Sequence, residues 1–266
     1  MRILEITVPG SFLKIGEEGP VQSEENRRRL DFLTSQFYEA NVSLIAFDAS
    51  STKQRLRQLL EGRPADEEQK REIHAELTSK YLALDADLDC KTQDQINLET
   101  EARFKRTKWQ NGELPAGFLR TEIVIHARAF VYALDAFGKT LQLLSDTPGC
   151  PGDLTDRHQE FRRAFPDLTS VSDSLQRVAD RAKGLRREKQ THPEPFRDQL
   201  APAAEGGIPA LNEQWGTRYG ISAENGHYSE VEVSLATMEK LRGILQRTMD
   251  AFSWEGDQQH LPPQNG

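Results

Sequence analysis

The sequence predicts a mainly α-helical protein, a helical bundle with a small β-hairpin near its C-terminal end. Apolar residues recur at steps of three and four along several long segments, as they do on one face of an amphipathic helix. The composition, 36% hydrophobic and 29% charged over 266 residues, suits such helices better than a thick β core. An Asn225-Gly226 pair between two alternating segments is typical of a hairpin.

The first part of the chain, residues 1–110, reads as an N-terminal helical region whose role the sequence does not indicate. Arg2 to Val8 is rich in β-branched residues and predicts a short strand. A helix is expected from about Ser23 to Leu60, with a break and a new N-cap near Ser50-Ser51. Pro64, a residue compatible with the first turn, opens a second helix, and a charged helix follows at about 93–109.

No metal or other cofactor is expected from the residue pattern. Cys90 and Cys150 lie far apart, without a CxxC or a companion histidine spacing, which argues against a zinc site or a disulfide framework. The acidic segment 85–94 resembles a calcium loop only superficially. Such a loop needs a glycine where Cys90 stands and a bidentate glutamate where Ile96 stands. A solvated acidic linker is the simpler interpretation.

The clearest element is a single long helix at 117–145. Its large apolar side chains form one stripe, and each should stabilise the fold by ~1.5–3 kcal/mol on full burial. The stripe consists of Leu119, Ile123, Ala127, Phe130, Leu134, Phe137, Leu141 and Leu144. This helix opens a predicted domain at 117–254.

The rest of that domain is a series of shorter elements. A helix from Thr155 to about Phe165 follows a Pro/Gly-rich loop, and a further proline-rich loop covers 191–209. The hairpin is expected at about 215–233, from Trp215–Ser222 and Tyr228–Val233. Ser234 can cap a closing amphipathic helix, and residues 255–266 are expected to form a frayed, flexible tail.

A basic segment interrupts this acidic protein at residues 157–189. It holds nine Lys or Arg and five acids, a net charge of +4, so the remainder of a chain of net charge −8 carries −12. Arginine favours phosphate because its planar fork gives bidentate hydrogen bonds. In the alternative interpretation the segment is a solvated helix face, in which Arg177 and Arg181 pair with Asp173 and Asp180.

The order of elements resembles the HEPN superfamily of small helical proteins. The likeness covers about residues 117–254 and rests on the long helix FLRTEIVIHARAFVYALDAFGKTLQLL, the segment FRRAFPDLTSVSDSLQRVADRAKGL, and the hairpin TRYGISAENGHYSEVEVS with its closing helix. Many members are metal-independent ribonucleases of toxin–antitoxin and phage-defence systems. Their motif is an arginine, usually a polar residue, and a histidine four to six residues further on. The arginine stabilises the phosphate, and the histidine is commonly assigned to RNA cleavage.

Carried onto this sequence, the motif is degenerate. Its arginine position falls at Ser172, its polar position at Asp173 and its histidine position at Arg177. Serine carries no fixed positive charge, and an arginine that stays protonated cannot act as a general base. The resemblance therefore implies a basic helix that binds RNA, a nucleotide or a protein partner without cleaving RNA. The residues expected to bind phosphate are Arg177, Arg181, Lys183 and Arg186.

Two further pairs have a similar spacing, so an active ribonuclease remains an alternative. Arg187 and His192 are the first candidate catalytic pair, although His192 precedes Pro193, where a helix is disfavoured. Arg120 and His126 are the second, but a six-residue step turns a helix by roughly 600° and leaves them about 120° apart. A structural or interaction protein whose arginines only pair with nearby acids is the third interpretation.

Charge and hydropathy restrict the setting of the protein. The net charge of −8 argues against the whole surface binding nucleic acid or an anionic membrane. The N-terminal residues lack the long apolar run of a signal peptide, and no apolar stretch approaches the roughly 20 residues that span a bilayer. We expect a cytoplasmic protein that does not associate with membranes. By the resemblance, it forms a homodimer.

Overall fold

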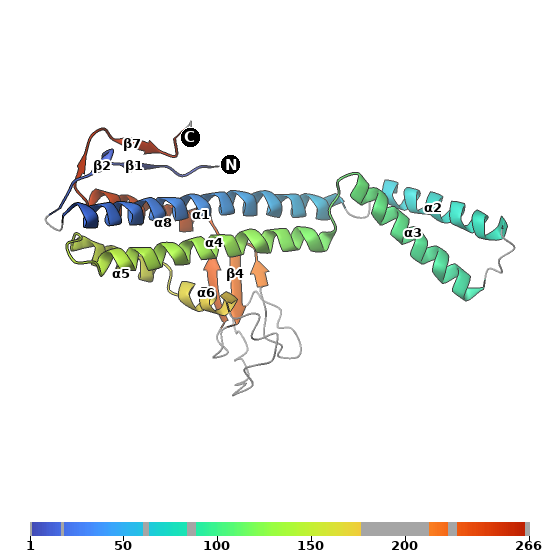
Figure 1. Cartoon of the computed structure of the whole chain (residues 1–266). Helices are drawn as coiled ribbons and strands as arrows, with labels where there is room; N and C mark the ends of the chain where they lie inside the picture. The colour runs from blue at the N-terminus through green and yellow to red at the C-terminus, as the bar shows by residue number, and fades with distance from the viewer. Residues whose placement is uncertain are drawn as a thin grey trace, which may run out of the picture. The chain divides into compact units, whose positions relative to one another are not determined.

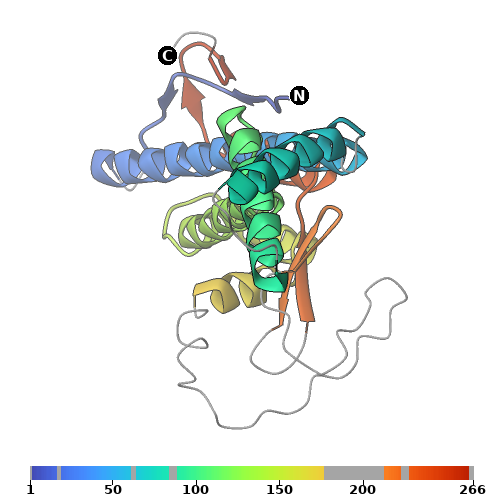
Figure 2. The same cartoon turned by 90° about the vertical axis from the view of Figure 1, so that its right-hand side faces the viewer.

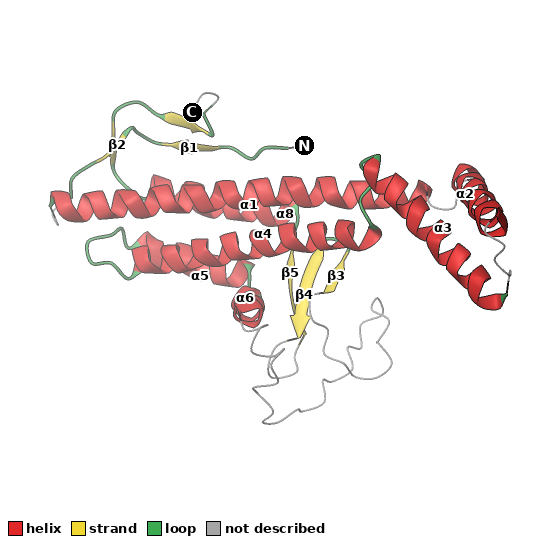
Figure 3. Ribbon diagram, turned by 45° about the vertical axis from the view of Figure 1, so that its right-hand side comes forward, coloured by secondary structure: helices red, strands yellow, loops and turns green. Residues whose placement is uncertain are grey.

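The protein is described from a computed structural model that covers residues 2–16, 19–60, 64–83, 89–176, 213–222 and 228–263. The chain forms two compact units, Met1–Phe47 with Val124–Gly266, and Asp48–Ile123. Helices dominate both units, and the strands are few, short and antiparallel (Figure 3). The predicted mainly α-helical class is therefore confirmed.

The larger unit is built around two long helices, α1 (Pro20–Leu60) and α4 (Ala116–Ser145), each of which also supplies residues to the smaller unit. Within the larger unit the first part of α1 and the later part of α4 run antiparallel, side by side (Figures 1 and 3). Every residue that the sequence places on the α4 stripe is at most 2% exposed. Further buried apolar side chains of this unit come from α1 and from α8 (Leu235–Asp250), namely Leu30, Leu33, Phe37, Met238, Leu241 and Leu245.

Helix α5 (Asp153–Ala164) packs on α8 and, through an aromatic cluster, on α4. The Phe161 ring stacks on Phe137 with a centroid distance of 5.7 Å and meets Phe165 edge-on at 4.9 Å. Gly138 makes this close approach feasible, because a Cβ there would lie 2.4 Å from Cε1 of Phe161. One glycine in the middle of α4 thus provides the space that the Phe161 ring needs.

A three-stranded antiparallel sheet packs against α6 (Leu168–Gln176), as Figure 2 shows. Its order is β3 (Glu213–Trp215), β4 (Arg218–Ser222) and β5 (Tyr228–Glu232). The predicted pairing of β4 with β5 is confirmed, with Tyr219 opposite Val231. Trp215 was expected to begin the first hairpin strand but belongs to β3, because Gly216 has φ of 60° and turns the chain before β4. The Asn225-Gly226 turn lies outside the described residues.

The two ends of the chain are paired with each other, which the sequence did not indicate. β1 (Ile6–Val8) pairs with β7 (Gln259–Leu261), and β2 (Phe12–Leu13) pairs with β6 (Trp254–Glu255), so the chain ends lie close together (Figure 1). The prediction of a frayed tail from Glu255 is wrong for the residues up to Leu261. The partner strands lie some 250 positions away in sequence, so no local pattern indicates their pairing.

Side-chain amides fasten the N-terminal segment to the helices. Gln246 of α8 accepts from the backbone N–H of Thr7 at 2.9 Å and donates to its carbonyl oxygen at 2.7 Å. Asn41 of α1 donates to the carbonyl oxygen of Leu4 at 3.1 Å. These bonds satisfy backbone groups of the segment that its pairing with β7 leaves open.

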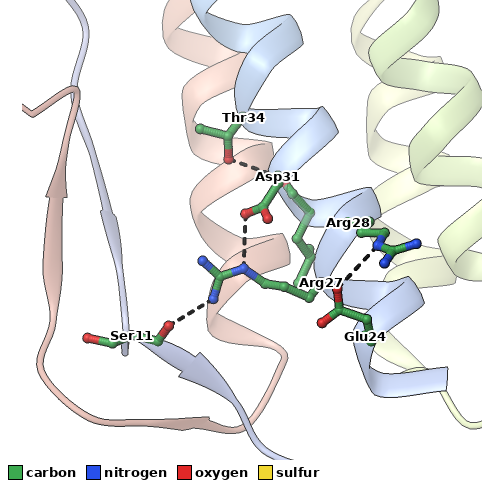
Figure 4. A network of polar contacts seen from close by, with 7 residues as sticks. Ser11, Glu24, Arg27, Arg28, Asp31 and Thr34 are labelled. Carbon is green, nitrogen blue, oxygen red and sulfur yellow. Dashed lines mark hydrogen bonds and ion pairs between the residues drawn. The ribbon is translucent and has the colours of Figure 1, made fainter. Parts of the chain in front are cut away.

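Arg27 joins α1 to the terminal strands, as Figure 4 shows. Its Nε donates to Asp31 at 3.0 Å, and its Nη1 donates to the carbonyl oxygen of Ser11 at 3.0 Å. The guanidinium also lies over the Trp254 ring, 5.3 Å from its centroid. The neighbouring Arg28 makes only an ion pair with Glu24 along the helix, so it joins no other element in the part of the chain that is described.

The smaller unit contains α2 (Pro64–Ala83) and α3 (Cys90–Gln110), which pack together. Leu77 and Ile96 are fully buried. Ion pairs cross between the two helices in antiparallel order, Lys108 with Asp66 at 2.7 Å and Arg103 with Glu76 at 3.1 Å. Much of the surface of this pair is charged, as the sequence predicts for this region.

The sequence correctly predicts where two helices begin, but it wrongly predicts a break within α1. Pro64 begins α2 as expected, and the Ser234 hydroxyl accepts from the N–H of Thr237 at the start of α8. The predicted break near Ser50-Ser51 is wrong, since α1 continues to Leu60. Ser50 is buried, and the Ser51 hydroxyl makes no hydrogen bond to any described residue, so neither acts as a cap. No described helix combines the length and apolarity needed to cross a bilayer.

We predict opposite effects for two glycine-to-alanine changes in α4. Gly138→Ala should lower the free energy of unfolding by about 1–3 kcal/mol, because the new methyl group overlaps the Phe161 ring. Gly117→Ala meets nothing within 4 Å, so it should be neutral or stabilise the helix by up to about 1 kcal/mol. Urea unfolding followed by circular dichroism measures both, and a harmless Gly138→Ala would contradict this packing.

A second pair of variants tests the attachment of the terminal strands. Arg27→Met keeps the length of the side chain but removes its bond to Ser11 and its contact with Trp254. We expect a loss of about 1–2 kcal/mol and faster hydrogen exchange in β1 and β7. Arg28→Met, at a side chain 76% exposed, should change stability by less than about 0.5 kcal/mol. Equal losses of stability in the two variants would contradict the attachment of the terminal strands to α1 by Arg27.

Candidate functional site

The candidate site is a polar stripe on α4 that faces α6 and the three-stranded sheet. Arg128, Tyr132, Asp135 and Lys139 recur at steps of four, three and four, which places them on one side of the helix. The apolar stripe on the opposite side of α4 is buried, so it fixes the direction in which these polar side chains point. Three of the four residues contact one another or another element of the larger unit.

Asp135 is the centre of the stripe, and Ser172 of α6 is bonded to it. The Ser172 hydroxyl donates to Oδ2 of Asp135 at 2.8 Å, and Nζ of Lys139 lies 2.7 Å from the same oxygen. Ser172 is 0% exposed and Asp135 is 8% exposed. A buried carboxylate needs such partners, because an isolated charge is costly to remove from water. The bond therefore fixes α6 on α4.

Arg128 and Tyr219 form a second link, between α4 and β4. Nε of Arg128 donates to the Tyr219 hydroxyl at 3.1 Å, and Tyr219 is fully buried. Burial raises the pKa of Tyr219 above its ordinary value, and the bond from Arg128 opposes that rise only in part. The phenol therefore remains neutral at physiological pH and acts as a fixed hydrogen-bond acceptor.

The sheet also contacts α6 directly. The Ser229 hydroxyl of β5 donates to the hydroxyl of Ser170 at 3.1 Å. Between the strands, Tyr228 covers Gly220 so closely that a Cβ at that position would lie 2.0 Å from the Tyr228 hydroxyl oxygen. The hairpin therefore requires glycine at this position.

The structure locates only part of the predicted site. Ser172, at the motif's arginine position, is completely buried in the contact with Asp135, and Asp173 is half-buried beside it on α6. Helix α6 is described to Gln176, so Arg177 follows directly on its last described residue. The remaining predicted site residues lie outside the described part of the chain; they are Arg177, Arg181, Lys183, Arg186, Arg187 and His192.

The other candidate residues are dispersed. Arg120 and His126 both belong to the unbroken helix α4, on which the six-residue step keeps them on different sides. Asp89, at the end of the acidic segment, accepts from the N–H of Thr92 at 2.8 Å and caps α3. Among the residues described, no three His, Cys, Asp or Glu side chains are grouped as a metal site requires.

Sequence reasoning missed Asp135, Arg128 and Tyr219. The available signal for Asp135 was its place in the most apolar helix of the chain, where a charged residue among buried neighbours needs a partner. Arg128 lies in the same helix and has the same signal, but nothing local indicates Tyr219 as its partner, because their contact joins positions 91 residues apart. These three side chains, with Ser172, define the described site.

Chemically, the described cluster can hold elements of the larger unit together through hydrogen bonds to a buried carboxylate and a buried phenol. The carboxylate of Asp135 is bonded to Ser172 and paired with Lys139, and the Tyr219 phenol is buried and neutral. Comparisons with known proteins give no match, whether to a protein-family model, a curated protein or a solved structure.

We predict that Ser172→Ala destabilises the larger unit. The change leaves the buried Asp135 carboxylate without one hydrogen bond, so the free energy of unfolding should fall by about 1–3 kcal/mol. Ser170→Ala, which removes a bond between two neutral, less buried hydroxyls, should cost less than about 1 kcal/mol. Urea denaturation of both variants provides the comparison, and a silent Ser172→Ala would contradict a structural role for this bond.

Proposed function

We propose that this chain is a HEPN-like protein with a degenerate motif, which binds RNA phosphates through its basic segment 157–189 and does not cleave RNA. The observation that carries the proposal is the complete burial of Ser172, whose hydroxyl donates to Asp135. The position at which the resembling ribonucleases carry their phosphate-stabilising arginine thus holds a short side chain engaged inside the fold.

The absence of cleavage follows from the chemistry of the substituted positions. A neutral serine cannot balance the charge that develops on a phosphate during cleavage. Arg177, at the histidine position, stays protonated at every working pH and cannot accept a proton from a 2′-hydroxyl. Without both functions, the site retains only its ability to bind.

Binding is supported by the charge of the segment and by the exposed arginines of α5. Arg162 and Arg163 are both exposed. Arg163 donates to the amide oxygen of Gln159, so within the described ranges no carboxylate neutralises it. Arg157, in contrast, is paired with Glu160 at 3.0 Å. Exposed guanidinium groups without an acidic partner are suited to phosphate oxygens.

The wider setting comes from the resemblance. It supports a homodimer, because in many HEPN proteins the site lies at a dimer interface, and a cytoplasmic role in a toxin–antitoxin or phage-defence system. A nucleotide or a protein partner on the same basic helix is the related alternative. The two competing interpretations are an active ribonuclease that uses Arg187 and His192, and a structural protein that binds no nucleic acid.

We predict salt-dependent RNA binding that depends on the basic segment. Each phosphate contact on a single strand should contribute about −0.7 to the slope of log affinity against log salt concentration. Arg177→Ala with Arg181→Ala should therefore make the slope shallower by roughly 1–1.5 and weaken binding to all sequences alike. Fluorescence anisotropy with a labelled RNA measures this. The matched control is Arg28→Ala with Arg71→Ala, two arginines more than 70% exposed that lie outside the segment.

Cleavage of the same RNA distinguishes the three interpretations. The proposal predicts an intact RNA in the presence of EDTA. Metal-independent cleavage that disappears in His192→Ala would establish the ribonuclease. No binding even at low salt would leave the structural interpretation, in which the arginines pair only with neighbouring acids.

A further inference from the structure

The smaller unit, Asp48–Ile123, contains a cavity of about 750 Å³ to which no role has been assigned. Its walls come from the last turns of α1, from α2 and α3, from the segment that follows α3, and from Leu119 at the start of α4. The volume lies within the range of roughly 300–1,000 Å³ that is typical of small-molecule sites. All of its lining residues belong to this one unit.

Two of the lysines that line the cavity lie over the ring of one phenylalanine. Nζ of Lys70 lies 5.0 Å and Nζ of Lys108 lies 5.5 Å from the centroid of the Phe104 ring. Lys70 is also paired with Glu101 at 2.8 Å, and Lys108 with Asp66 at 2.7 Å. The hydrogen bond to Glu101 raises the pKa of Lys70, and the bond to Asp66 raises that of Lys108. Glu101 and Asp66 are therefore already paired with Lys70 and Lys108.

Two other lysines of the cavity have only distant acidic partners among the described residues. Lys53 lies 4.0 Å from Glu122, and Lys105 lies 3.8 Å from Glu101, both longer than a hydrogen bond. Their side chains are 52% and 57% exposed, so the ammonium groups can be reached from solvent. The side chains that line the cavity include one more Lys or Arg than Asp or Glu.

Large apolar side chains line the same cavity without being buried. Leu56 is 55% exposed, Trp109 is 48% exposed and Leu114 is 36% exposed. A group of exposed leucine and tryptophan side chains in a hollow indicates a binding surface for an apolar group. The cavity thus combines apolar surface with one excess positive charge, in a chain of net charge −8.

We propose that this cavity binds an apolar carboxylate, a molecule with an aliphatic or aromatic body and a single carboxylate group. The body lies against Leu56, Trp109 and Leu114. The carboxylate accepts hydrogen bonds from the ammonium groups of Lys53 and Lys105. The site is independent of the RNA-binding proposal, since none of its residues belongs to the basic segment.

Titration calorimetry with decanoate and 1-decanol on the full chain tests the proposal, because the two compounds share one apolar body and differ in charge. Decanoate should bind at least about tenfold more tightly, the factor expected from charge-assisted bonds of at least about 1.4 kcal/mol. Naphthalene-2-carboxylate, tested in parallel, shows whether the body is aliphatic or aromatic. Decyltrimethylammonium, the cationic counterpart, should bind more weakly than decanol.

Variants separate the two parts of the site. Lys53→Gln with Lys105→Gln should abolish the preference for decanoate over decanol, and Leu56→Asp should weaken binding of both. The controls are Lys91→Gln and Leu98→Asp, exposed positions on α3 that do not line the cavity. Circular dichroism verifies that each variant is folded. Equal affinity for decanoate and decanol, unchanged binding in the cavity variants, or no binding of any of these compounds would overturn the proposal.

Discussion

The apolar stripe of α4 has to be removed from water, and the larger unit is arranged around that requirement. Its residues from Phe130 to Leu144 are almost fully buried against apolar side chains of neighbouring elements. The same helix carries a polar stripe on another side, so the elements that meet this side must supply hydrogen bonds as well as contact. Gly138 completes the arrangement, because its missing side chain leaves room for Phe161.

Asp135 takes part both in the packing of α6 on α4 and in the candidate functional site. Its carboxylate could be buried only with partners, and Ser172 and Lys139 provide them. On the proposed HEPN-like alignment, the partner on α6 stands at the position of the motif's arginine. We therefore propose that this position holds two helices together instead of holding a phosphate. This exchange favours a protein that binds over one that cuts.

Much of the fold could be predicted because its signals are local. The 3.6-residue period of α4, the serine cap of α8 and the alternation of β4 and β5 all follow from neighbouring residues. The pairing of β1 with β7 could not, since each strand is very short and its partner lies at the other end of the chain. The same reason applies to the site. Ser172 was identified from a motif, whereas its partner Asp135 lies 37 residues away and depends on how α6 packs.

We propose that the degenerate motif leaves a protein that binds RNA without cutting it. A crystal structure of the chain with an RNA oligonucleotide protected by 2′-O-methyl groups tests it most directly. We predict phosphates bound by arginines of segment 157–189, with the Ser172 hydroxyl still bonded to Asp135. An RNA phosphate held between Arg187 and His192, with the imidazole facing the position of a 2′-oxygen, would contradict it.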